Sequence, residues 1–331
     1  MNSERSDRGL GMRPLRFTCA VSVVALALGL TAVAARETQT VPNGTGKFMN
    51  NVGDIGGRSR VFITYVPNNL KPGAPLLIMF HGGGGDGPMA RLGTGGVYDH
   101  LADRDGFIVV YPYGIGRSWN TCRKAQSNVA RRWDVDDIGF VEAIIEQSAR
   151  TYGIDRKRVF VTGHSNGGQI SYRLLLERPD LVAGVAAVSS TLPAPDNMDC
   201  MPKNVPTPVM TINGTGDPVA LYDGGQRPGG GNGPALSTKA TMEYFAKLNG
   251  QDGEPEVTRL PHLKASDPTS VERTAWTKPG RPPVILYTIH GGGHLVPQPY
   301  YTYPRVVGRM TQDMNAPEII WEFFSKLPPR E

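Results

Sequence analysis

Residues 163–167 read Gly-His-Ser-Asn-Gly and could form the tight turn that presents a nucleophilic serine. The apolar stretch 158–162 precedes this motif, and an amphipathic helical pattern follows it. A strand, a sharp turn and a helix are the context that such a serine requires, because the two glycines remove side chains that would clash. We therefore predict that Ser165 attacks an acyl carbon, against the alternative of an ordinary serine turn.

A glycine-rich run, His-Gly-Gly-Gly-Gly at residues 81–85, follows a short apolar stretch. Attack on an acyl carbon produces an oxyanion, which backbone N–H groups already in place can stabilise. We expect Gly83 and Asn166 to supply these N–H groups, and we interpret His81 as structural. The run could instead bind phosphate, but it is not followed by the Lys-Ser or Lys-Thr pair of a phosphate-binding loop.

The base and the acid that orients it should follow the serine, with the acid first and a histidine second. Three histidines lie late enough in the sequence, namely His262, His290 and His294. We predict His294 as the base because it follows three glycines in a loop, and we interpret His290 as a buried, hydrogen-bonded residue at a strand end. For the acid we predict Asp217, just beyond a predicted strand, rather than Asp223 farther into the same loop.

Seven short apolar runs predict the buried strands that must bring these residues together. They cover residues 60–66, 76–80, 107–111, 159–162, 185–189, 209–213 and 284–289. Helices are predicted directly after Ser165 and at residues 136–152, 237–249 and 315–326. This alternation predicts an α/β fold with a mostly parallel sheet and helices on both faces. Residues 112–132 and 224–234 lack a regular pattern and are predicted to be long surface loops.

Residues 1–35 have the form of a signal peptide, because arginines precede an apolar run at 17–33 that ends in small residues. A run this short is at the lower limit for crossing a bilayer, so we expect cleavage, export to the periplasm or the medium, and no lasting membrane insertion. Cys19 lies at the start of the run, which argues against lipid attachment. We predict a mature N-terminal arm at 36–56 and one catalytic domain at 57–331.

Loss of residues 1–35 removes four arginines and two acids and lowers the formal net charge from +5 to +3. So small a charge, with dispersed basic residues, excludes nucleic acid as the expected partner. Two cysteines remain, and an oxidising destination favours a Cys122–Cys200 disulfide over two free buried thiols. Neither cysteine has histidine or cysteine neighbours at ligand spacing, so we predict no metal, and the expected chemistry needs no cofactor.

Four segments carry a family resemblance: Gly-His-Ser-Asn-Gly-Gly at 163–168, Val-Asp-Asp-Ile-Gly-Phe at 135–140, Tyr-Gly-Ile-Asp-Arg-Lys-Arg-Val at 152–159, and Gly-Gly-Gly-His at 291–294. Together they resemble the secreted polyhydroxybutyrate depolymerase and feruloyl esterase group, within the carbohydrate-esterase-like α/β-hydrolases. The resemblance covers residues 55–325 and implies an α/β-hydrolase fold. Carried over residue by residue, it implies the roles already predicted for the nucleophile, acid, base and oxyanion donors, which are Ser165, Asp217, His294, Gly83 and Asn166.

The sequence departs from this group directly after the predicted base, where Leu295, Val296 and Pro297 stand in place of the group's common tryptophan. We therefore expect the pocket wall beside the base to differ. Polymer-degrading members of the group tend to carry a linker and a surface-binding domain, which we do not expect in this chain. The resemblance thus favours soluble esters or short oligomers as substrates over a solid polymer.

Five aromatic residues in loop-like stretches are candidates for lining an acyl pocket, and we expect more than half of them to pack elsewhere: Trp119, Trp133, Tyr113, Tyr300 and Tyr301. We expect Asp136 and Asp137 to cap or orient the helix that follows them rather than contact substrate.

The predicted chemistry is two-step acyl transfer to water, on feruloyl-type esters, acetylated sugars or short hydroxyalkanoate oligomers. The same residues could instead pass the acyl group to a sugar hydroxyl, as an acyltransferase does, or cleave an amide, as a peptidase does. A third alternative is a non-catalytic binding protein on a hydrolase scaffold. The presence of all three residue types in the order Ser, Asp, His argues against that alternative.

Overall fold

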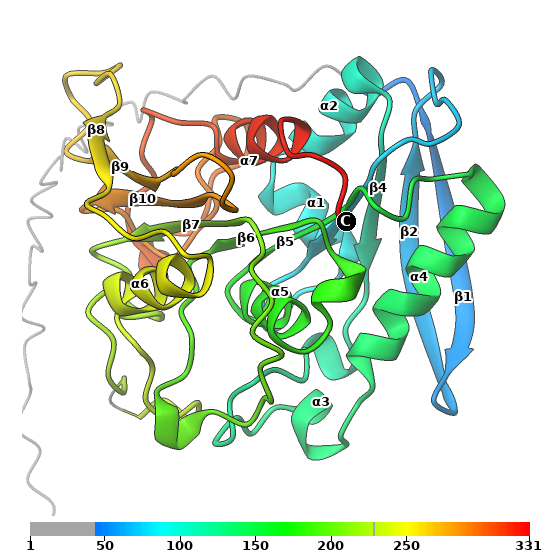
Figure 1. Ribbon diagram of the computed structural model, residues 1–331, viewed down its shortest axis with the longest axis horizontal. Coiled ribbons are helices and arrows are strands. Elements are labelled where there is room, and N and C mark those ends of the chain that lie inside the picture. Colours follow the sequence, from blue (N-terminus) through cyan, green and yellow to red (C-terminus); the bar gives the residue numbers. More distant parts are fainter. Residues whose placement is uncertain (1–43, 228) are drawn as a thin grey trace, which may run out of the picture. The chain divides into compact units, whose positions relative to one another are not determined.

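The computed structural model describes residues 44–227 and 229–331, so the predicted signal peptide lies outside the described part. Within it, ten strands form one mixed sheet in the order β1-β2-β4-β3-β5-β6-β7-β10-β9-β8 (Figure 1). All seven predicted strands are present: β2 (Arg58–Val66), β3 (Leu76–Phe80), β4 (Ile108–Pro112), β5 (Val159–His164), β6 (Gly184–Val188), β7 (Val209–Gly214) and β10 (Val284–His290). Six of them, β3 to β7 and β10, run parallel to one another, as the alternating pattern predicts.

Three strands were not predicted, and they lie toward the two edges of the sheet. β1 (Lys47–Ile55) pairs antiparallel with β2, so part of the predicted N-terminal arm belongs to the sheet. β9 (Ser270–Trp276) pairs antiparallel with β10, and β8 (Glu256–Arg259) pairs with β9. Side chains of β1 and β8 are mostly exposed, so these strands lack the apolar runs that mark buried ones.

Helices cover both faces of the sheet, which confirms the predicted fold class (Figure 1). One face carries α4 (Asp137–Tyr152), α5 (Asn166–Glu177) and α6 (Thr238–Leu248), while α1 (Gly87–Gly93), α2 (Val97–Asp105) and α7 (Ala316–Ser325) pack on the other. Strand β3 contributes Ile78 and Phe80 to the first core and Leu77 and Met79 to the second. Because both of its faces are covered, the sequence of this strand is a continuous apolar run. Among the described helices, none is long and apolar enough to cross a membrane.

The segment 112–132, predicted to be a surface loop, is buried in its central part and contains the short helix α3 (Val129–Arg132). Each of residues 118–123 is at most 5% exposed. The predicted Cys122–Cys200 disulfide ties this segment to the loop after β6. Trp119 donates hydrogen bonds from its backbone N–H to Asn166 Oδ1 and from Nε1 to His81 O. An irregular segment can be buried when its polar groups are paired in this way.

We expect the disulfide to contribute about 2–4 kcal/mol to the free energy of unfolding, since it joins residues 78 positions apart and so restricts the unfolded chain. A Cys122→Ser/Cys200→Ser variant should therefore unfold at a lower denaturant concentration than the oxidised wild type. Adding dithiothreitol should lower the wild-type midpoint to that of the double variant and leave the variant unchanged. If dithiothreitol did not change the wild-type midpoint, this result would contradict the disulfide.

Candidate active site

The predicted site residues lie in loops that follow parallel strands. The loop after β3 contains Gly83, and Ser165 directly follows β5. Asp217 follows β7, and His294 follows β10. Because parallel strands present their carboxyl ends at the same edge of a sheet, residues far apart in sequence converge there.

The turn that carries Ser165 depends on close backbone approach. Ser165 has φ 56° and ψ −119°, a conformation that residues with a β-carbon rarely adopt. A β-carbon on Gly163 would lie 2.3 Å from the carbonyl carbon of Gly167, and one on Gly167 would lie 2.3 Å from Phe80 O. Both glycines of the motif are therefore required, and the turn presents Ser165 at the start of α5.

Three of the predicted side chains form a continuous hydrogen-bonded chain. Ser165 Oγ donates to His294 Nε2 at 2.8 Å, and His294 Nδ1 donates to Asp217 Oδ2 at 2.7 Å. The other carboxylate oxygen of Asp217 accepts from the backbone N–H groups of Val219 and Ala220. The carboxylate is thus held in place, and it orients the imidazole so that Nε2 can accept the serine proton.

The competing residues lie away from this chain. Asp223 is exposed, and His262 bonds to Asp313 instead. His290 was predicted to be buried, but it is exposed at the end of β10, with Nε2 3.9 Å from Glu272. The strand ends as it leaves the sheet, so its last side chain faces solvent even though the residues before it are buried.

The backbone N–H groups of Gly83 and Asn166 both lack an acceptor among the described residues. The two segments are adjacent, because a β-carbon on Gly83 would lie 3.8 Å from that of Asn166. The N–H of Asn166 has no acceptor within its helix, because Asn166 is the first residue of α5 and no helical carbonyl precedes it. Both groups are free to donate to an oxygen bound beside Ser165.

His81 holds the glycine-rich run in place, in agreement with a structural role. Its Nδ1 donates to Gly82 O, and its Nε2 accepts from the backbone N–H of Gly114. Burial lowers the pKa of His81 to about 4, so the ring is neutral at neutral pH and keeps this pair of bonds. The Trp119 ring packs against it, with ring centroids 4.7 Å apart.

Asp136 and Asp137 both lie at the start of α4, as predicted, and have different partners. Asp136 caps the helix by accepting from the backbone N–H of Gly139 at 2.7 Å. Asp137 is fully buried, pairs with Arg60 at 2.7 Å and accepts from the backbone N–H of Asn120 at 2.7 Å. Asp137 therefore anchors the buried segment that packs Trp119 against the glycine-rich run.

We expect Asp137→Ala to lower the free energy of unfolding by about 3–5 kcal/mol, because it leaves the Arg60 guanidinium, 1% exposed, without its carboxylate. Asp136→Ala removes a neighbouring acid that only caps the helix, so its cost should be about 1 kcal/mol. Chemical denaturation of both single variants and of the double variant Arg60→Met/Asp137→Ala measures their free energies of unfolding. The double variant should regain much of the loss, and equal costs for the two single variants would contradict the buried pair.

An apolar cavity of about 340 Å³ opens beside the glycine-rich run and is lined by both Ser165 and His294. Its other walls come from helix α1 and from the segment that follows His294, and they include Met89, Leu92, Val296, Tyr301, Tyr303 and Val307. Of the five aromatic candidates, Tyr301 alone lines this cavity; Trp119 is fully buried and Trp133 is 54% exposed. Tyr303 was missed because nothing in its local sequence distinguishes it from its neighbours. Val296 lies two residues after His294, in the stretch where the sequence departs from the family pattern.

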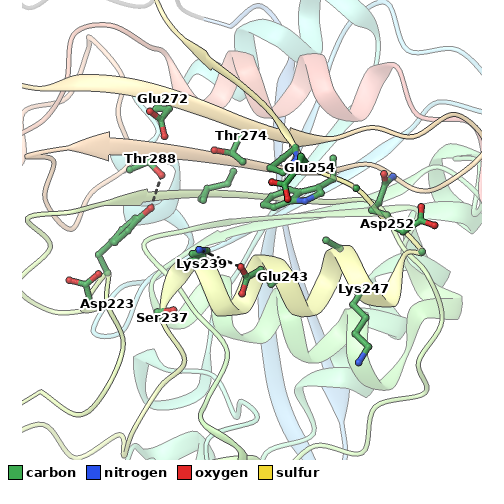
Figure 2. A pocket seen from close by; sticks show the side chains of 18 residues that line it. Asp223, Ser237, Lys239, Glu243, Lys247, Asp252, Glu254, Glu272, Thr274 and Thr288 are labelled. Carbon is green, nitrogen blue, oxygen red and sulfur yellow. Dashed lines mark hydrogen bonds and ion pairs between the residues drawn. The ribbon is translucent and has the colours of Figure 1, made fainter.

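A second cavity of about 110 Å³ also reaches Ser165 and His294, and its lining is more polar than that of the apolar cavity, although it includes Val219 and Leu221. A larger hollow of about 1010 Å³ lies between α6 and strands β9 and β10 (Figure 2). Charged side chains such as Asp223, Glu243 and Glu272 line that hollow, but neither Ser165 nor His294 does. Only the two smaller of these three cavities therefore reach the hydrogen-bonded chain of Ser165, His294 and Asp217. In the described part of the chain, no cluster of three or more His, Cys, Asp or Glu residues could hold a metal ion.

Comparisons with known proteins identify esterases among the proteins similar to this chain. A family model described as phospholipase/carboxylesterase matches residues 63–227. NocK of Nocardia uniformis subsp. tsuyamanensis, provisionally named an esterase, is 29% identical over 81% of this chain and 80% of its own length. A bifunctional acetylxylan esterase/xylanase of Neocallimastix patriciarum is 31% identical over 63% of this chain, and a feruloyl esterase B of Piromyces equi is 29% identical over 67%. The matches span 31% and 39% of those two relatives, respectively.

Among solved structures, an acetyl xylan esterase from Aspergillus awamori superposes with a TM-score of 0.55 at 18% identity. The match covers 85% of this chain and 99% of that chain. At this identity the likeness establishes the fold alone. Together, the comparisons confirm the α/β-hydrolase fold and the resemblance to feruloyl esterases that the sequence predicts.

Proposed function

We propose that this chain, whose residues 63–227 match the phospholipase/carboxylesterase family model, is an ester hydrolase that cleaves its substrates through an acyl-enzyme formed on Ser165. The observation that carries the proposal is the hydrogen-bonded chain from Ser165 through His294 to Asp217. The adjacent N–H groups of Gly83 and Asn166 support it, because the negative charge of the reaction develops on an oxygen beside the serine.

In the first step, His294 Nε2 takes the proton of Ser165 Oγ as this oxygen attacks the ester carbon. The N–H groups of Gly83 and Asn166 donate to the oxyanion of the tetrahedral intermediate. The intermediate collapses, and the alcohol leaves with the proton from His294. Water, deprotonated by the same imidazole, then attacks the acyl-enzyme and releases the acid, while Asp217 keeps the imidazole oriented.

The substrates we propose are soluble esters: feruloyl-type esters, acetylated sugars or short hydroxyalkanoate oligomers. The names of the acetylxylan esterase and feruloyl esterase relatives support the first two classes. The apolar cavity of about 340 Å³ beside the glycine-rich run is large enough for an aromatic or short aliphatic group.

We also propose that the mature protein works outside the cytoplasm, in the periplasm or the medium, after cleavage of residues 1–35. The Cys122–Cys200 disulfide supports this location, because such bonds form and persist in oxidising compartments.

Active-site labelling combined with product analysis tests the mechanism. An organophosphorus reagent that phosphorylates activated serines should add one group per chain, located on Ser165 by peptide mass spectrometry, and a good ester substrate should slow the labelling. The ester panel is 4-nitrophenyl butyrate, methyl ferulate, an acetylated xylo-oligosaccharide and a hydroxybutyrate dimer. Release of free acid in the presence of added glycerol supports hydrolysis, whereas glyceryl esters identify an acyltransferase. Modification of another serine with concurrent loss of activity would reject the assignment.

A further inference from the structure

Arg123 places a buried positive charge beside the reactive serine. Its side chain is 5% exposed and lines the 110 Å³ cavity together with Ser165 and His294. Nη2 donates to Thr191 O at 3.2 Å, and Nε is buried with no hydrogen-bond partner. No Asp or Glu oxygen of the described residues lies within the 4.0 Å of an ion pair with this guanidinium.

Arg60, the other buried arginine of the described residues, differs in that it is paired with the carboxylate of Asp137. A guanidinium removed from water loses hydration that only an anion or several hydrogen bonds can replace. Burial lowers the pKa of Arg123 to about 10, but the group still carries its charge at neutral pH. Its position is therefore costly in the free protein and favourable once an anion is bound.

The rest of the cavity favours an anion as well. Its lining contains a second arginine, Arg227, and the neutral polar residues Gln169, Thr191 and Asn232, but no Asp or Glu. A volume of about 110 Å³ accommodates a carboxylate with a short stretch of chain, since a liquid water occupies roughly 30 Å³. The planar donors of a guanidinium match the two oxygens of a carboxylate.

We propose that Arg123 is a specificity-determining residue that binds a free carboxylate of the substrate, a few bonds away from the ester that Ser165 attacks. The inference rests on the proposed function, and it selects one of the proposed substrate classes. A short hydroxyalkanoate oligomer carries both an ester and a terminal carboxylate, whereas an acetylated sugar or a ferulate ester lacks this acid. The polar cavity then receives the acid end, and the apolar cavity receives the remaining aliphatic part.

A pair of substrates with the same single ester bond tests this proposal: the 3-hydroxybutyrate dimer as free acid and as its terminal N,N-dimethylamide, which is neutral and adds no second ester. The wild type should show a kcat/KM about 10- to 100-fold higher for the free acid, the range expected for hydrogen bonds to a charged group. Arg123→Met should bring the ratio close to one by losing activity on the free acid alone. Arg123→Lys should retain part of the preference, and Arg132→Met, which removes an exposed arginine outside the cavity, should retain all of it.

A binding measurement keeps this proposal separate from the proposed catalytic mechanism. The free-acid dimer should raise the thermal unfolding temperature of Ser165→Ala but not that of Ser165→Ala/Arg123→Met, whether or not the wild type hydrolyses it. A wild-type ratio near one, or an equal loss on both substrates in Arg123→Met, would overturn carboxylate recognition. Turnover by Ser165→Ala would instead overturn the acyl-enzyme while leaving the binding result intact.

Discussion

Replacing Ser165 with alanine is expected to lower kcat for ester hydrolysis by about a million-fold, to a rate set by the oxyanion donors and substrate binding alone. The alanine has no oxygen to form the acyl-enzyme, and His294 loses the group from which it takes a proton. The unusual φ of 56° is already occupied by a residue with a β-carbon, so the turn should tolerate alanine. Initial rates with 4-nitrophenyl butyrate measure the loss of activity, and an unchanged circular dichroism spectrum checks that the variant is folded.

Ser171→Ala is the matched control for this variant. Ser171 lies in the same helix, is fully buried, and donates its hydroxyl to Gly167 O rather than to His294. Its loss should reduce stability slightly and leave kcat within a few-fold of the wild type. Retention of more than one thousandth of the wild-type rate by Ser165→Ala, in protein free of wild-type contamination, would contradict a covalent mechanism.

The sequence predicted the interior of the sheet well because strands covered on both faces have continuous apolar runs. β3 and β5 are examples, and their predicted starts at residues 76 and 159 agree with the structure. The edge strand β8 was missed since all four of its side chains are exposed. Helix α1 was missed as well, because it has only seven residues and glycine at both ends.

The sequence predicted those site residues whose type and order along the chain are constrained by backbone geometry. Ser165 required glycines at fixed positions, and the strand ends limited where Asp217 and His294 could lie. Arg123 was not predictable, because its importance depends on burial without a carboxylate in an irregular segment that has no sequence period. Whether a buried arginine lacks a carboxylate partner depends on the folded structure, and it leaves no pattern in the local sequence.

The second large effect is expected for Asp217→Asn, which should lower kcat by about ten thousand-fold. Oδ1 of Asp217 accepts from the backbone N–H groups of Val219 and Ala220, so the amide oxygen of the asparagine must take that position. Its NH₂ group then faces His294 Nδ1, which must become an acceptor. The imidazole proton moves to Nε2, where it prevents His294 from accepting the proton of Ser165.

Asp223→Asn is the matched control, because it makes the same chemical change at an exposed acid in the same loop. It should keep kcat within two-fold of the wild type. Asp217→Ala is a second comparison: it has no NH₂ group to force the proton onto Nε2, so it should be at least as active as Asp217→Asn. If Asp217→Asn retained a tenth of the wild-type rate, or if Asp223→Asn were the damaging change, the acid would be misassigned and the backbone-fixed carboxylate would have a structural role only.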